Sequence, residues 1–112
     1  MTMKLALAAL ALGLTVGTAQ AGNPEAGKEK SRTCAACHGP DGNSATGDFP
    51  RLAGQHYDYL LKSLKDYKSG ARKNPIMAPL AATLTPRDMD DLAEFYSHQQ
   101  GLITRKHAHT VR

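Results

Sequence analysis

Two cysteines separated by two residues and followed directly by a histidine limit what this chain can fold into more than any other feature. Cys34 and Cys37 are the only cysteines among the 112 residues. A disulfide between them would close a loop of a few residues and would constrain little of the unfolded chain. A domain of this length buries a small core and usually needs a cross-link or a bound group. The motif therefore predicts that both thiols hold a group at the centre of the fold.

The first 21 residues differ from everything that follows. Lys4 is their only charge, an apolar run covers residues 5–12, and small residues end in Ala19-Gln20-Ala21. This layout predicts a secretory signal peptide over 1–21 that is cleaved before Gly22. The alternative is an uncleaved anchor helix, although the apolar core is short for a permanent span and we expect none in the mature protein. The expected domain is then 22–104, followed by a flexible basic tail over 105–112.

The charge of the mature chain gives no support for a nucleic-acid partner. The net charge is +4 for the whole chain, and it is one unit lower once Lys4 has been removed. The basic residues do not form a stripe with interleaved aromatic residues, as a nucleic-acid surface would.

Three segments of the chain carry helical signals. The first begins at the Asn23-Pro24 cap and runs into the cysteine motif. The second begins near Gln55 and ends at Gly70, and its apolar residues share one face. The third begins at the capping box of residues 85–88 and ends at Gly101.

The segments between these helices, 39–54 and 71–84, are rich in Gly, Pro and polar residues and are predicted to be loops. The chain shows neither strand-like alternation nor an internal repeat. Two long loops in so small a domain are expected only if they enclose something large and flat. The sequence therefore predicts an all-α single domain, with three main helices and two long loops wrapped around one bound group.

The bound group follows from the residues 34–38, because C-x-x-C-H is the attachment sequence of a c-type haem. Two thiols add to the haem vinyl groups as thioethers, and His38 lies beneath the iron as an axial ligand. A thioredoxin-like redox pair would need a βαβ context, and zinc would need two further ligands at suitable spacing. The prediction is one covalent haem c held by Cys34, Cys37 and His38.

Met77 is the predicted second axial ligand. It lies in the second loop, between Pro75 and Pro79, which stiffen the backbone on either side. Met89 lies on the apolar face of the last helix and is expected in the core. The histidines outside the motif are expected to be solvated or in the tail: His56, His98, His107 and His109.

The chain resembles the class I c-type cytochromes, and among them the small bacterial domains found singly or paired in the two-haem cytochromes c-four. The resemblance covers nearly the whole mature chain. It is carried by the motif 34–39 with Gly27-Lys28 before it, the run Phe49-Pro50-Arg51-Leu52-Ala53-Gly54-Gln55, and the segments 41–44, 69–72, Met77 and Leu92-Ala93 with Tyr96. With one haem motif, the chain matches half of a two-haem protein.

The resemblance implies roles for residues outside the motif. His38 and Met77 would be the axial ligands, and the Pro50 carbonyl would accept a hydrogen bond from the His38 ring. Arg51 would pair with a haem propionate. Gly27 would let the first helix cross the last one closely, near Tyr96. The residues 30–32 depart from the family pattern, because they are more polar than the small apolar residues usual there.

These features predict a periplasmic protein that carries single electrons and is not an enzyme. An iron ligated by histidine and methionine has no open position for a substrate. The expected partners are other redox proteins, met transiently by a monomer, with Lys62, Lys65, Lys68, Arg72 and Lys73 as a possible docking surface or an ordinary solvated one. The alternative is a haem subunit of a periplasmic dehydrogenase of flavocytochrome type. A haem-based sensor would require a labile Met77.

Overall fold

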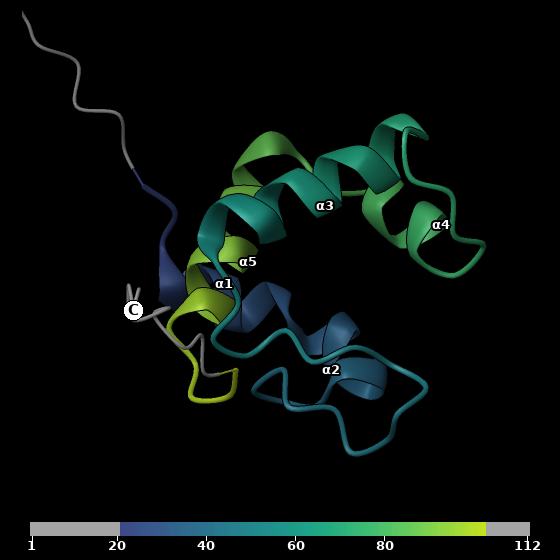
Figure 1. Ribbon diagram of the computed structural model, residues 1–112. Helices are drawn as coiled ribbons and strands as arrows, with labels where there is room; N and C mark the ends of the chain where they lie inside the picture. The colour runs from purple at the N-terminus through teal and green to yellow at the C-terminus, as the bar shows by residue number, and fades with distance from the viewer. Residues whose placement is uncertain (1–20, 103–112) are drawn as a thin grey trace, which may run out of the picture.

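The computed structural model describes residues 21–102, which form five α-helices and no strand. The helices are α1 (Pro24–Lys30), α2 (Arg32–His38), α3 (Tyr57–Ser69), α4 (Met77–Ala82) and α5 (Pro86–Ser97). The predicted all-α class is thus confirmed, and Figure 1 shows the arrangement. None of these helices has the length and apolar character needed to cross a membrane. The predicted signal peptide, apart from Ala21, and the predicted tail lie outside the described residues.

Helices α1 and α5 cross at unusually short range, because the contact point on α1 is a glycine. A Cβ atom added at Gly27 would lie 2.0 Å from the carbonyl oxygen of Asp91 and 2.7 Å from Cβ of Phe95. The close crossing expected at Gly27 is therefore present. It is centred on Asp91 and Phe95, whereas the ring of Tyr96 lies against Gly42 of the first loop.

A buried carboxylate joins the same two helices. Asp91, only 2% exposed, accepts hydrogen bonds from the Asn23 backbone N–H at 2.7 Å and from Nζ of Lys30 at 2.6 Å. Arg87 Nε lies 3.1 Å from Asp91 Oδ1, the oxygen that also accepts from Asn23, and Lys30 also pairs with Asp88 at 2.8 Å. Lys30, one of the residues that depart from the family pattern, is thus what ties α1 to α5.

These contacts shift the ionisation of all three partners. The hydrogen bond to Asp88 is the main reason why the pKa of Lys30 is raised, and the same bond lowers the pKa of Asp88 to about 2. Burial alone would raise the pKa of Asp91, but the hydrogen bonds from Asn23 and Lys30 outweigh it and the pKa is lowered. The network is therefore fully charged at neutral pH.

The first predicted helix is divided at Ser31, which ends α1 and begins α2. The Ser31 hydroxyl donates to the Lys28 carbonyl at 2.7 Å. A serine side chain that takes a nearby backbone carbonyl competes with the regular helical hydrogen bond and favours a break. The consequence is that α2 turns away from α1 and carries the cysteine motif as a helix of its own.

The second predicted loop contains a helix, so the prediction of loop is wrong over residues 77–82. The start of α4 carries the same signal as that of α1, an asparagine followed by proline. Asn74 Oδ1 accepts from the N–H groups of Ile76 and Met77, both at 2.9 Å. Within residues 21–102, α4 packs against α3 and against no other helix.

The core is small and lies between α3 and α5. Its buried members are Leu60, Leu92, Ala93, Phe95 and Tyr96, and partly buried side chains of α3 and of the loops pack around them. Because α5 contacts both α1 and α3, it is the element around which the others are placed.

We predict that Asp91→Asn lowers the free energy of unfolding by about 2 kcal/mol, the usual size of hydrogen bonds to a charged group. The matched control is Asp66→Asn, which removes one carboxylate from the exposed pair with Lys62 and should change stability by less than about 0.5 kcal/mol. Denaturant titration of both variants, followed by circular dichroism, measures the difference. Equal effects of the two substitutions would contradict a structural role for the network.

Acid should remove this contribution in a defined range. A carboxylate whose pKa is lowered in the folded state stabilises it above the ordinary pKa of 3.8 and ceases to do so as the pH falls through the folded value, about 2 for Asp88. The stability gap between the wild type and Asp91→Asn is therefore expected to be constant above pH 3.8 and to close below it.

Candidate haem-binding site

A cavity of about 480 Å³ lies between α2 with the following loop on one side and α3, α4 and α5 on the other. All residues predicted for the site line this one cavity: Cys34, Cys37, His38, Pro50, Arg51 and Met77. Five of them lie on α2 and in the first loop, and Met77 comes from α4. Helices α2 and α4 do not pack on one another, so tertiary structure alone brings Met77 to the cysteine motif.

The wall of the cavity is mainly apolar. Leucines from the first loop, α3, the end of α4 and α5 face it: Leu52, Leu60, Leu64, Leu84 and Leu92. Such a wall excludes water and suits a large flat apolar group. The chemistry of the cavity is therefore concentrated in the few polar and sulfur-containing side chains that reach it.

The two thiols lie about one turn apart on the same face of α2. Cys34 and Cys37, three residues apart on α2, are both half-buried and form no disulfide. Residues at this spacing share one helix face. Burial raises the pKa of the Cys34 thiol, which keeps it protonated and uncharged. Both thiols face the apolar cavity, where they are available for thioether bonds.

His38 is the last residue of α2 and is 5% exposed. Its Nδ1 lies 2.8 Å from the Pro50 carbonyl oxygen. Since that oxygen can only accept, Nδ1 carries the hydrogen and donates it, and Nε2 keeps its lone pair. Gly39 follows with a φ of 81°, which lets the chain leave the helix immediately after the histidine.

Met77 is the first residue of α4 and is half-buried in the cavity wall. The other candidates weighed from the sequence lie elsewhere. Met89 is a core residue at 3% exposure, as expected. His56 is exposed, and His98 is also exposed, with its Nδ1 2.8 Å from the Glu94 carbonyl oxygen. His107 and His109 lie outside the described residues.

Arg51 is exposed at the rim of the cavity and makes no ion pair within residues 21–102. Three basic residues of α3 and of the turn after it contact other groups of the chain. Lys62 pairs with Asp66, Lys68 donates to two carbonyls, and the guanidinium of Arg72 lies 4.7 Å from the ring centre of Tyr67.

The sequence did not predict that the Tyr96 hydroxyl is buried at the edge of the cavity. It is the one buried side-chain polar atom without a hydrogen-bond partner in the part of the chain that the structure describes. It lines the cavity close to Cys34, and burial raises its pKa strongly. Its neighbours Ser31 and Cys34 place the hydroxyl beside the cysteine motif. The position of Tyr96 on the apolar face of the last helix was the feature of the sequence from which this burial could have been predicted.

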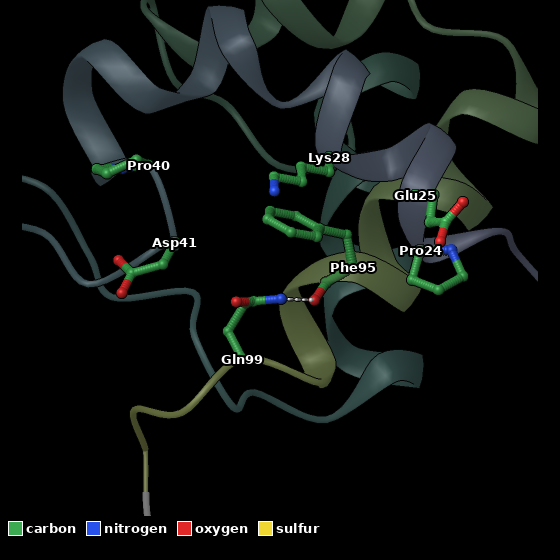
Figure 2. Close-up of a pocket in the computed structure, with 7 residues that line it drawn as sticks. All are labelled: Pro24, Glu25, Lys28, Pro40, Asp41, Phe95 and Gln99. Atoms are coloured by element: carbon green, nitrogen blue, oxygen red, sulfur yellow. Dashed lines mark hydrogen bonds between the residues drawn. The ribbon is translucent and has the colours of Figure 1, made fainter.

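A second hollow, of about 440 Å³, lies where the first turn of α1 meets the end of α5. Figure 2 shows Phe95 at its centre, with Lys28 and Asp41 at its sides. The Gln99 amide donates to the Phe95 carbonyl at 3.0 Å and closes one edge. It contains no thiol or imidazole, and we assign it no function.

Fold and site together define a class of protein. An all-α domain that presents two free thiols and a histidine with an available Nε2 to an apolar cavity is built to hold one covalent haem c. The family model of cytochrome c matches residues 24–100. The chain belongs to the cytochrome c family, and its C-x-x-C-H motif implies one covalent haem c.

Individual relatives show which members of the cytochrome c family this chain resembles. The chain is 42% identical over 103 residues to cytochrome c4 of Stutzerimonas stutzeri, a match that covers 84% of this chain and 49% of that protein. It is 42% identical over 83 residues to cytochrome c-554(548) of Halomonas halodenitrificans, covering 71% of this chain and 100% of that protein.

A solved structure of a cytochrome c4 also matches this chain. Reduced recombinant cytochrome c4 from Pseudomonas stutzeri superposes with a TM-score of 0.70 at 42% identity, covering 74% of this chain and 48% of that chain. The chain thus spans about half the length of the cytochromes c4 that it matches, as expected for a single domain of that type.

We predict that either thiol alone keeps the haem covalently bound and that removing both releases it. Cys34→Ala and Cys37→Ala should each retain the haem mass under denaturing conditions, while the double variant should lose it, as intact mass spectrometry will show. Ala36→Ser is the matched control on the same helix. Haem mass retained by the double variant would contradict attachment at these cysteines.

Proposed function

We propose that this chain is a periplasmic carrier of single electrons, with its haem iron ligated by His38 and Met77. The observation that carries the proposal is that these two side chains, on helices that do not pack on one another, line the same cavity. The bound haem supplies the one-electron oxidation and reduction. The remaining steps are tasks of the chain itself.

His38 and Pro50 control the proximal side. The Nδ1–H donated to the Pro50 carbonyl sets the tautomer and the ring orientation and makes Nε2 a stronger base. Met77 offers a thioether, a weak donor to ferric iron, which favours the reduced state more than a second histidine would. With both positions filled by protein, no position is left for a substrate, in keeping with a carrier.

The apolar wall contributes by excluding water. Leu60 and Leu92 belong to the packed core that backs the cavity, so the surroundings change little when one electron enters or leaves. Arg51 would pair with a haem propionate, and its exposure at the rim without an ion pair within residues 21–102 supports this role. These features support a site that is prepared for fast electron exchange.

Redox proteins of the same compartment are the proposed partners, met transiently by a monomer. Lys65 and Lys73 lie on the exposed side of α3 and its following turn, where a positive surface would attract acidic partners. Lys68 and Arg72 contribute charge there although both contact their own chain. The predicted signal peptide supports a periplasmic location.

We predict that Met77→Ala strengthens the apparent affinity of the ferric protein for imidazole by at least about tenfold, because the protein ligand no longer competes. Met77→His should remain ligated but should lower the reduction potential, since histidine favours ferric iron. Imidazole titration and redox potentiometry measure these effects. An unchanged affinity in Met77→Ala would show that another group is the second ligand.

The choice between a free carrier and an enzyme subunit depends on the state of the native protein. Periplasm is fractionated by size while haem absorbance and this polypeptide are followed together. Elution near the mass of one mature chain is the expected result. Stable co-elution with a larger flavin- or metal-containing chain would contradict the mobile carrier and favour the dehydrogenase subunit.

A further inference from the structure

We propose that Asn74 and Lys68 are positioning residues for Met77: their side chains hold the two ends of α4 and thereby keep the methionine in place. The inference rests on the proposed function, in which Met77 is the second axial ligand. It assigns a role to two polar side chains that the haem motif does not include.

Helix α4 needs such support because it is short and covered on one side only. It has six residues and packs against α3 alone within residues 21–102. Ile76 at its start is 54% exposed and Leu80 in its middle is 40% exposed. A helix of this length is unstable in water without tertiary contacts. The position of Met77 therefore depends on what fixes the ends of α4.

Asn74 fixes the first end. Its Oδ1 accepts from the N–H of Ile76 and from the N–H of Met77 itself, both at 2.9 Å. Its backbone carbonyl accepts from Ala78 N–H at 3.0 Å, so the turn that leads into α4 is closed at Asn74. The side chain thus serves as a cap for two donors that have no partner within the helix. One of these donors belongs to the residue that carries the sulfur.

Lys68 fixes the other end from the neighbouring helix. Its ammonium group donates to the carbonyl of Ala82 at 3.2 Å and also to that of Leu84. A cation at the last carbonyls of a helix satisfies acceptors that have no helical partner and interacts favourably with the helix dipole. Lys68 therefore acts across the α3–α4 interface, in addition to adding charge to the surface.

The consequence concerns how often Met77 leaves its position. When the two ends of α4 are held, the methionine-off state requires breaking these hydrogen bonds or moving α4 away from α3. The apparent affinity for an external ligand is the intrinsic affinity multiplied by the fraction of molecules in the open state. Loosening either end raises that fraction, so imidazole should bind more tightly.

The first test compares Asn74→Ala with Asn74→Asp in the ferric haem protein. Loss of a helix cap corresponds to about fivefold in an equilibrium constant, so Asn74→Ala should bind imidazole about fivefold more tightly than the wild type. Asn74→Asp keeps the accepting oxygen and should remain near the wild-type value. A tightening of equal size in both variants would overturn the role of the Asn74 acceptor.

The second test compares two lysines of α3. Lys68→Ala should bind imidazole about threefold more tightly, while Lys65→Ala, which removes the same charge from an exposed position without carbonyl contacts, should leave the affinity unchanged. Equal shifts in both variants would trace the effect to surface charge and overturn the role of Lys68.

Met77→Ala separates this inference from the proposed function. Its absorption band from methionine sulfur to ferric iron should vanish, while the band should persist, weakened by the open fraction, in Asn74→Ala and Lys68→Ala. If Met77→Ala binds imidazole like the wild type, the proposed ligation fails. If Met77→Ala binds more tightly but Asn74→Ala and Lys68→Ala both match the wild type, the ligation stands and the positioning role fails.

Discussion

The contact between α1 and α5 at Gly27 is the constraint on which the rest of this domain depends. With no Cβ at that position, the two helix backbones meet directly, and the buried Asp91 carboxylate joins them through the Asn23 N–H and Lys30. The segment that follows α1 carries the cysteine motif, and α5 carries four of the five buried residues of the core cluster. Fixing one helix against the other therefore fixes the proximal wall of the haem cavity relative to the core behind it.

The two proposed axial ligands, His38 and Met77, are supported in different ways. His38 ends α2, is buried, and is held by the Pro50 carbonyl, and both cysteines predicted to attach the haem lie on the same helix. Met77 begins α4, whose only helix contact within residues 21–102 is with α3. An opening of the site is thus expected on the methionine side. The hydrogen bonds that hold α4 therefore matter for keeping Met77 in position.

Several basic residues combine an internal contact with a surface charge. Lys30 lies in the network of α1 and α5, and Lys68 donates to the carbonyl of Ala82, the last residue of α4, and to that of Leu84 just beyond the helix. From the sequence alone, Lys68 reads as part of a docking surface, because a lysine on the polar face of a helix has no visible partner. Its partners are carbonyls 14 and 16 residues further along the chain, and only folding brings them near.

The sequence by itself determined the c-type haem and the all-α class, and it predicted attachment at Cys34 and Cys37, because these depend on short motifs, caps and helical periodicity. It also predicted Met77 as the second ligand, although it placed this residue in a loop where the structure has the helix α4. Only the tertiary structure decided the network at Asp91 and the partnerless hydroxyl of Tyr96. The physical reason is that these features depend on which groups are buried together, and burial is a property of the packed chain.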